Sequence, residues 1–182
     1  MRIIAGKNRG RKLETLEGLA TRPTLDGTKE AIFSSLGGML YDFTVLDVFG
    51  GSGALSLEAI SRGAKKAYIL DNNIEAIDII KKNAKNLNSM KELTILYGDY
   101  HQILKRFENS KQFDLIFLDP PFRLKVIDEL IEYIIEKNLL ADEGYIVAEY
   151  PKEDVVNTLY DGFKVKLQRR YSSSEVLILE KE

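Results

Sequence analysis

Two hydrophobic patterns alternate along the chain from about residue 44 onward. Short, continuous apolar runs predict buried strands, and they cover residues 45–49, 67–70, 93–97, 113–118 and 145–150. Between these runs, apolar residues recur every three to four positions, which predicts helices at residues 54–62, 74–88, 100–107 and 126–135. Continuous apolar strands separated by helices favour parallel pairing, because helices then cover both faces of the sheet. The pattern predicts an α/β fold.

The two ends of the chain follow a different pattern. Apolar and polar residues alternate over residues 163–167 and 176–178, which predicts an antiparallel hairpin at the edge of the sheet. Residues 2–5 and 11–16 predict a small N-terminal hairpin, and a helix is expected at 26–40. We therefore expect a Rossmann-like, seven-stranded and mostly parallel sheet with an antiparallel C-terminal hairpin. A small N-terminal hairpin and helix are added to it.

Composition limits the range of possible functions. With 182 residues, of which 45% are hydrophobic and 30% charged, one soluble domain is expected, with residues 1–40 as an extension and 41–182 as the core. The chain has no cysteine and one histidine, His101, so we expect no disulfide and no metal site, and a surface or capping role for His101. No apolar stretch reaches the roughly 20 residues that span a bilayer, and the N-terminus is too quickly polar for a signal peptide. A cytoplasmic, membrane-free protein is the default expectation.

Charge changes this picture at the N-terminus. The net charge of −2 argues against a nucleic-acid partner when taken over the whole chain. However, residues 1–29 hold seven basic and three acidic residues, a net charge of +4, and the remainder carries −6. Such a patch can bind phosphates locally, although a solvated surface hairpin explains it equally well. The candidate phosphate contacts are Arg2, Lys7, Arg9, Arg11 and Lys12.

A glycine-rich turn, Gly50-Gly51-Ser52-Gly53, joins the first predicted core strand to a helix. Glycines let a ligand approach the backbone closely, and the helix N-terminus offers free N–H groups to a carboxylate or phosphate. The turn suits either a dinucleotide or S-adenosylmethionine, but Ser56 stands where the dinucleotide fingerprint has its third glycine. A tight connection without a ligand remains the alternative.

Two acidic residues follow the next two strands. Asp71 lies 20 residues past Gly51, where a carboxylate can accept hydrogen bonds from both hydroxyls of a ribose. Asp99, in Gly98-Asp99-Tyr100, can accept from an adenine amino group, with Tyr100 beside it. Either acid can instead cap the helix that follows it, and for Asp99 that interpretation is at least as good.

The turn Asp119-Pro120-Pro121-Phe122 follows the fourth core strand, at the end of the sheet where open α/β folds bind ligands. Two prolines stiffen the backbone and remove two N–H donors. A carboxylate, a carbonyl and an aromatic ring are thus held together, which suits an exocyclic amine on a flat base. The alternative is a helix entry with Asp119 as its cap.

This series of motifs resembles class I S-adenosylmethionine-dependent methyltransferases that act on exocyclic amines. Within them, the chain is most similar to the RsmD-type enzymes, which methylate N2 of a guanine in 16S rRNA. The N-terminal stretches 2–6, 10–13, 22–24 and 30–33 extend this resemblance over the whole chain. Two positions depart from the family: Lys29 is the nearest cation where a further arginine is usual, and Ser172 stands where a glycine often follows the Arg-Tyr pair.

The resemblance implies a class I methyltransferase fold, S-adenosylmethionine as cofactor and S-adenosylhomocysteine as product. It implies that the methionine portion lies among Asp47, Phe49, Gly51, Ser52 and Gly53. Asp71 and Asn72 would take the ribose, Asp99 and Tyr100 the adenine, while Arg22, Pro23 and Thr24 would close the pocket. Asp119, Pro120, Pro121 and Phe122 would form the catalytic turn, with Phe122 stacked on the base. The expected partner is 16S rRNA or the small ribosomal subunit, bound by a monomer.

Four other functions share parts of this pattern. An N6-adenine methyltransferase acting on DNA or RNA uses the same amine chemistry, but 182 residues leave little room for a DNA-recognition domain. A protein-glutamine methyltransferase more usually has Asn in place of Asp119. A nicotinamide-dependent oxidoreductase lacks its third glycine here and an evident hydride-handling pair. A non-catalytic nucleotide-binding module leaves the Asp119 turn without a role.

Overall fold

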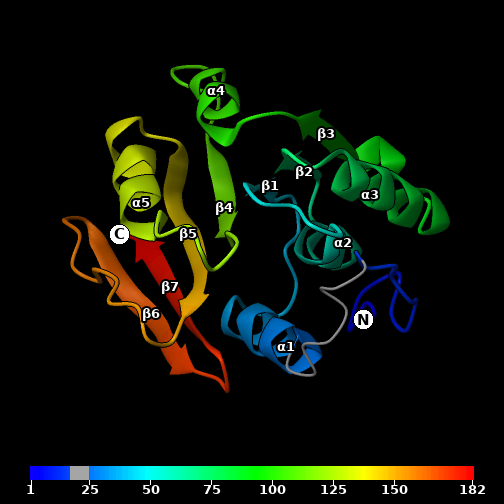
Figure 1. Ribbon diagram of the computed structural model, residues 1–182, viewed down its shortest axis with the longest axis horizontal. Coiled ribbons are helices and arrows are strands. Elements are labelled where there is room, and N and C mark those ends of the chain that lie inside the picture. Colours follow the sequence, from blue (N-terminus) through cyan, green and yellow to red (C-terminus); the bar gives the residue numbers. More distant parts are fainter. Residues whose placement is uncertain (17–24) are drawn as a thin grey trace.

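The computed structural model describes residues 1–16 and 25–182 (Figure 1). Within that part of the chain, seven strands form one sheet in the order β3-β2-β1-β4-β5-β7-β6. The strands are β1 Thr44–Asp47, β2 Lys66–Asp71, β3 Leu93–Tyr97, β4 Phe113–Leu118, β5 Leu140–Pro151, β6 Phe163–Arg170 and β7 Ser174–Lys181. The first five pair in parallel, whereas β7 pairs antiparallel with both β5 and β6. The expected mixed sheet with its antiparallel hairpin is confirmed.

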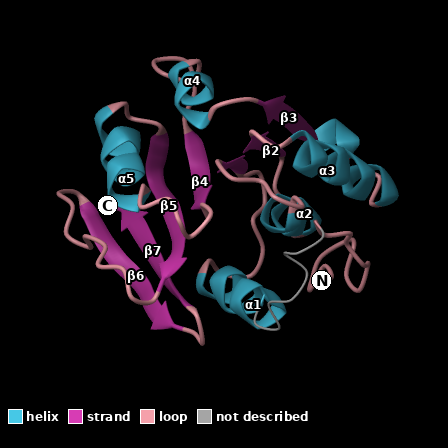
Figure 2. Cartoon of the chain, viewed as in Figure 1, coloured by secondary structure: helices cyan, strands magenta, loops and turns pink. Residues whose placement is uncertain are grey.

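Helices cover both faces of this sheet (Figure 2). They are α1 Leu25–Ser35, α2 Ala54–Ser61, α3 Ile74–Asn86, the 3₁₀ turn η1 Met90–Glu92, α4 Tyr100–Lys105 and α5 Ile127–Glu136. Helices α1, α2 and α3 share one apolar core with Phe117 and Val147, and α4 and α5 share the other with Leu118 and Ala148. Successive residues of one strand thus enter opposite cores, as the pleat of a strand requires. This alternation explains why the central strands β1 and β4 are largely apolar on both faces.

The strand order reverses between β1 and β4. From β1 the chain adds β2 and then β3 on one side, and β4 then pairs with the other side of β1, where Asp47 lies in register with Phe117. Loops from two neighbouring parallel strands diverge at such a switch point and leave a crevice at the carboxyl ends. The glycine turn after β1 and the Asp119 turn after β4 therefore face the same crevice.

The N-terminal segment docks on α2 through one buried carboxylate. Glu58 is fully buried and accepts hydrogen bonds from the backbone N–H groups of Ile4 (2.9 Å) and Ala5 (3.1 Å). Its oxygens also lie 2.8 Å from Arg62 Nε and 3.2 Å from Lys29 Nζ. Burial lowers the pKa of Lys29, and the adjacent Glu58 charge acts in the opposite direction. A buried charge with this many donors is well compensated, whereas losing one partner would be costly.

Gly6 sits at the closest point of this contact. A Cβ at Gly6 would lie 1.8 Å from the carbonyl oxygen of Ser61, and its φ of +84° is one that side chains rarely adopt. Lys7 N–H donates to that same carbonyl (2.8 Å), and Asn8 N–H donates to the Ser61 hydroxyl (2.9 Å). The segment is thus held at the last turn of α2, where free helical carbonyls need donors.

The N-terminal hairpin is smaller than expected. It is reduced to a single antiparallel bridge between Arg2 and Lys12, because the N–H groups of Ile4 and Ala5 go to Glu58 instead of a facing strand. Helix α1 ends at Ser35, before two glycines with positive φ, and not at residue 40. No helix within the described residues is long and apolar enough to cross a membrane.

Candidate active site at the carboxyl ends of the strands

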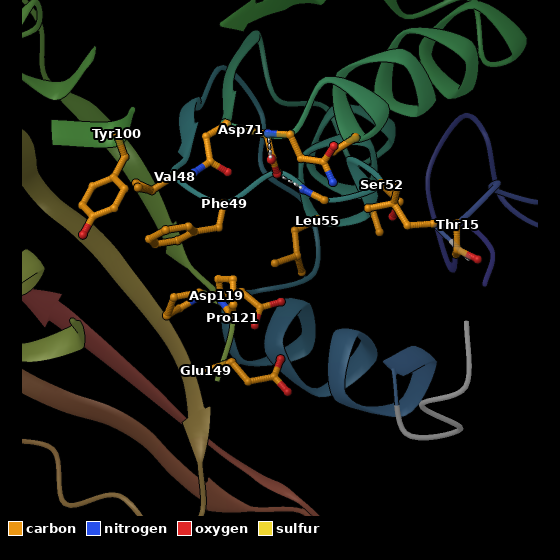
Figure 3. Close-up of a pocket in the computed structure, with 18 of the residues that line it drawn as sticks. Thr15, Val48, Phe49, Ser52, Leu55, Asp71, Tyr100, Asp119, Pro121 and Glu149 are labelled. Carbon is orange, nitrogen blue, oxygen red and sulfur yellow. Dashed lines mark hydrogen bonds between the residues drawn. The ribbon is translucent and has the colours of Figure 1, made fainter. Parts of the chain in front are cut away.

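A cavity of about 440 Å³ opens at the switch point (Figure 3). Its walls come from the loops after β1, β2, β3 and β4, the end of β5, helix α1 and the N-terminal segment. The candidate residues that it brings together are Phe49, Gly51, Ser52, Asp71, Asn72, Tyr100, Asp119, Pro120 and Pro121. Arg22, Pro23 and Thr24 lie outside the described residues. The volume is that of a site for a nucleoside-sized ligand.

Each glycine of the turn has a different reason to be glycine. A Cβ at Gly50 would lie 2.3 Å from Ile69 of β2, so this position must be bare for the turn to pack. Gly51 has a φ of +57° and open space beside it, on the cavity side. Gly53, the last residue of the turn, precedes α2 in a left-handed conformation (φ 80°). It is not among the described residues that line the cavity. Gly50 therefore lets the turn pack closely on β2, and Gly51 leaves the backbone accessible on the side where a ligand would approach.

Asp71 holds the turn from the neighbouring strand. Its Oδ2 accepts from Gly51 N–H at 2.9 Å, and its Oδ1 accepts from Asn73 N–H at 2.8 Å (Figure 3). Asn73, and not Asp71, caps α3 by accepting from Glu75 N–H. A carboxylate has about four acceptor positions, so these two bonds leave capacity for hydroxyl donors. Asp71 thus lines the cavity and also orders its glycine wall.

Asp47 lies beneath the turn instead of among the described residues that line the cavity. It is 1% exposed, and its Oδ2 accepts from the Ser56 hydroxyl of α2 at 2.9 Å. Burial raises the pKa of Asp47 to about 7, although the Ser56 hydroxyl acts in the opposite direction. This arrangement links β1 to α2, and Asp47 would influence a ligand only through the turn above it. Ser56 stands where the dinucleotide fingerprint has its third glycine, and in the structure its hydroxyl is the hydrogen-bond partner of Asp47.

An aromatic wall closes the cavity on the side of β3. The rings of Phe49 and Tyr100 lie 5.1 Å apart at 60°, and Tyr100 stacks on His101 at 4.1 Å. Burial raises the pKa of Tyr100, as do the charges of Glu129 and Asp99. Asp99 caps α4 by accepting from Gln102 N–H at 3.2 Å, and Gly98 and Tyr100 line the cavity in its place.

The Asp119 turn forms the opposite wall. Asp119, Pro120 and Pro121 line the main cavity, and Pro121 C=O accepts from Leu124 N–H at 2.8 Å, which closes the turn. Phe122 lines an adjoining depression of about 310 Å³ that shares Pro120 and Leu124 with the main cavity. Asp119 and Pro121 thus line only the main cavity, Pro120 lines both, and Phe122 lines only the neighbouring depression.

Several lining residues were missed by sequence reasoning. Glu149 lies near the end of β5 and is 8% exposed. In Figure 3 it is seen below Asp119 and Pro121. Lys29 of α1 and Arg123, just after the proline turn, also line the cavity. A carboxylate near the end of an otherwise apolar strand was the available signal for Glu149. Among the described residues, no group of three or more His, Cys, Asp or Glu side chains is placed to hold a metal ion.

The basic N-terminal residues are exposed along the segment that docks on α2. Arg2, Lys7, Arg9, Arg11 and Lys12 are all exposed, while Met1, Thr15 and Leu16 of the same segment line the cavity. Two of these basic side chains contact the body of the protein: Lys7 Nζ lies 2.8 Å from Glu92, and Arg11 Nη2 donates to Asn86 C=O. The segment therefore reaches from the cavity, where Met1, Thr15 and Leu16 lie, along α2 to the amino ends of β2 and β3, where Lys7 and Arg11 make their contacts.

Comparisons with known proteins identify the family of the chain. The family model described as conserved hypothetical protein 95 matches residues 1–180. The chain is 37% identical over 154 residues to the Ribosomal RNA small subunit methyltransferase D of Haemophilus influenzae, covering 84% of this chain and 80% of that one. The same-named Escherichia coli protein is 33% identical over 159 residues, covering 87% and 79%.

The fold also matches solved structures. An Escherichia coli protein provisionally named as the methyltransferase yhhF has a TM-score of 0.88 and 30% identity, covering 100% of this chain and 98% of that chain. The class I methyltransferase fold expected from the sequence is thereby confirmed. Since the family model and both relatives span most of the sequence, the chain belongs to the family described as conserved hypothetical protein 95, together with the small-subunit rRNA methyltransferases D.

Proposed function

We propose that the protein is an S-adenosylmethionine-dependent methyltransferase that modifies the N2 amine of a guanine in small-subunit rRNA. One observation carries the proposal. The Asp119 carboxylate and the Pro120 turn line the same cavity as the glycine turn and Asp71, on opposite sides of the β1/β4 switch point. A nucleoside wall thus faces an amine-accepting wall. The names of the two relatives supply the RNA class.

The residues of the first wall fit S-adenosylmethionine. Open space beside Gly51 admits a ligand close to the backbone, and the N-terminus of α2 behind it favours a carboxylate. Asp71 has acceptor capacity for ribose hydroxyls, and the rings of Phe49 and Tyr100 offer an apolar surface to an adenine. When bound, this cofactor would supply a methyl group activated by a sulfonium charge.

The second wall fits an amine with two hydrogens. Amine hydrogens require acceptors, and Asp119 provides a carboxylate while Pro120 provides a backbone carbonyl on a rigid turn. Accepting both hydrogens orients the nitrogen lone pair away from the base plane, and the Asp119 charge stabilises positive charge developing on the nitrogen. No covalent enzyme intermediate is required. This assignment gives Asp119 and Pro120 the catalytic roles.

The basic N-terminal segment suits a large polyanionic substrate. Its exposed side chains continue from Met1, which lines the cavity, along α2 to the amino end of β3, so an RNA bound by them would extend from the cavity across this surface. The base itself must leave its stack to enter a cavity of this depth, which is least costly in an unpaired RNA loop. Binding of the RNA backbone and selection of the base are therefore assigned to different residues.

Transfer of labelled methyl tests the proposal directly. The purified protein is given labelled S-adenosylmethionine with small ribosomal subunits, free 16S rRNA, DNA or protein, and the product nucleoside is identified by mass spectrometry. We expect N2-methylguanosine at one position of the RNA, in the subunit or the free rRNA. Calorimetry should detect S-adenosylmethionine and not NAD. Labelling of adenine, or of protein alone, would overturn the proposal.

A further inference from the structure

The register of the sheet places Glu149 beside Asp119. Leu118 of β4 is paired with Ala148 of β5 in the parallel ladder, so the next residue of each strand is Asp119 and Glu149. Neighbouring strands lie roughly 4.8 Å apart, and in-register residues point to the same face. Here that face is the one shared with Phe117, Val147 and helix α1. Two carboxylates are therefore adjacent at the end of the cavity opposite Asp71 (Figure 3).

Burial makes Glu149 an unusual choice at this position. The residue is 8% exposed, and its neighbours along β5, Val147, Ala148 and Tyr150, are buried apolar or aromatic residues. A buried carboxylate needs hydrogen-bond donors, and the roughly four acceptor positions of Glu149 can take N–H groups of a ligand in addition to its contacts within the protein. Glu149 lines the cavity close to the amine-accepting turn, so such a ligand would meet it there.

The edge of guanine has the required donors. It presents the two N2 hydrogens and, next to them, the N1 hydrogen, whereas adenine presents an unprotonated N1 that is an acceptor. If Asp119 and Pro120 accept from N2, the N1 hydrogen lies alongside and needs an acceptor of its own. The neighbouring strand provides a carboxylate on a side chain one methylene longer than that of aspartate.

We propose that Glu149 is the specificity-determining residue of the site: its carboxylate accepts the N1 hydrogen of the target guanine and repels the N1 lone pair of adenine. The inference rests on the proposed guanine-N2 function. It assigns guanine selection to the end of β5, because the Asp-Pro-Pro-Phe turn serves amines of guanine and adenine alike. Roughly four acceptor positions on a carboxylate allow this bond alongside contacts to the protein.

The test varies both the target base in the RNA and the side chain at position 149. Once the wild-type protein has identified the target position, RNA is prepared with guanine or 2-aminopurine there, in whichever of free rRNA or subunit is methylated. 2-Aminopurine keeps the N2 amine but has an unprotonated N1. Transfer is measured with the wild-type protein and with Glu149→Gln, whose amide can donate to that nitrogen. Glu143→Gln, an exposed residue of the same strand, is the matched control.

We expect the wild-type protein to prefer guanine, and Glu149→Gln to lower the guanine to 2-aminopurine ratio of kcat/KM by about tenfold or more. Glu143→Gln should leave the ratio unchanged. Fluorescence of 2-aminopurine in RNA bound to protein saturated with S-adenosylhomocysteine gives a second readout without turnover, and Glu149→Gln should bind this RNA more tightly than the wild-type protein.

A structural role for Glu149 would lower both activities together and leave the ratio unmoved, which overturns the inference. Calorimetry with S-adenosylmethionine shows that the cofactor wall of each variant is intact. The proposed function and this inference fail separately. If the wild-type protein methylates guanine N2 and the ratio is unaltered, the function stands and the role of Glu149 falls. If the wild-type protein methylates adenine or no RNA, the function itself falls.

Discussion

The two walls of the cavity are rigid for different reasons. On the side of β1 and β2, side-chain hydrogen bonds order the backbone: Asp71 holds Gly51 and Asn73, and Asp47 holds Ser56. On the side of β4, two proline rings fix the turn covalently, and a backbone bond from Leu124 closes it. Asp71 of the first wall therefore orders the glycine turn and also lines the cavity, whereas Asp47 is buried beneath the turn. On the second wall, the stiffness of the backbone comes from the two proline rings and not from a side-chain hydrogen bond of the first wall.

This difference separates two kinds of mutational effect. Removing Asp71 from the β1/β2 wall should damage both stability and cofactor affinity, because the same carboxylate holds the turn and lines the cavity. Removing Asp119 should damage the transfer step while the cofactor wall stays intact. The distinction would be refuted by a variant of one wall that shows the effects expected for the other wall.

The largest effect is expected for Asp119→Ala. Loss of a charged acceptor for the amine should lower kcat by about 10³-fold, since preorganised charge stabilisation of this kind is worth that much. S-adenosylmethionine affinity, measured by calorimetry, should be retained. Asp142→Ala, an acid of β5 with a 92% exposed side chain, is the control. Full activity of Asp119→Ala would refute its amine-accepting role.

Asp71→Ala should have a mixed effect. Losing a charged acceptor for ribose hydroxyls should weaken S-adenosylmethionine binding about 10–100-fold. The N–H groups of Gly51 and Asn73 also lose their acceptor, so Tm should fall by a few degrees even without cofactor. Scanning calorimetry and titration calorimetry measure the two effects. Weaker binding with an unchanged Tm would contradict the shared role.

The basic N-terminal segment belongs to neither wall. Changing Arg9 and Arg11 together to Gln should weaken RNA binding and reduce the slope of log affinity against log salt by about 1.4–1.8, corresponding to two lost phosphate contacts. Cofactor affinity should not change. Lys164→Gln with Lys166→Gln, on the far edge strand β6, is the matched pair of charges. An unaltered slope for Arg9 and Arg11 would remove the N-terminal segment from the RNA interface.

The smallest effect concerns pH and Asp47. Its pKa, raised to about 7 in the folded protein, lies above the ordinary value of 3.8, so the folded state binds the extra proton between these values. The free energy of unfolding should therefore fall as pH rises from about 4 to about 7. Asp47→Asn keeps an acceptor for Ser56 but removes this titration. Its Tm should exceed that of the wild-type protein by a few degrees at pH 8 and by less at pH 5; an equal difference at both pH values would contradict the buried charge.

Local patterns predicted the sheet well and its irregular parts poorly. The strands at residues 93–97 and 113–118 match β3 and β4 to the residue, because each largely apolar run ends sharply at polar residues or glycine. Strand β5 begins at Leu140, five residues before the apolar run at Tyr145. The polar residues between belong to an irregular stretch, where the register with β4 shifts and Glu143 adopts a φ of 59°. Such a shift depends on the facing strand and leaves no local trace.

The site divides in the same way. The glycine turn and the proline turn are contiguous motifs, so their residue types alone indicated a cavity. Glu149 and Lys29 reach it through pairings distant in sequence, with β4 and with Glu58 of α2. For Asp99, the local motif left a ligand contact and a helix cap equally open, and only the structure shows that the side chain caps α4. Spacing along the sequence identifies residues of the same loop. The strand register is needed to identify residues from different strands that line the same cavity.

The position of β7 has a consequence for the order in which the protein is built. Strand β7 follows β6 in the chain but lies between β5 and β6 in the sheet, and six of its eight residues are buried. Strand β6 therefore has no neighbour to join until β7 has been synthesised, and the open edge of β5 waits for it. During synthesis, the half of the molecule that carries Glu149 becomes a finished sheet only after the final strand has left the ribosome.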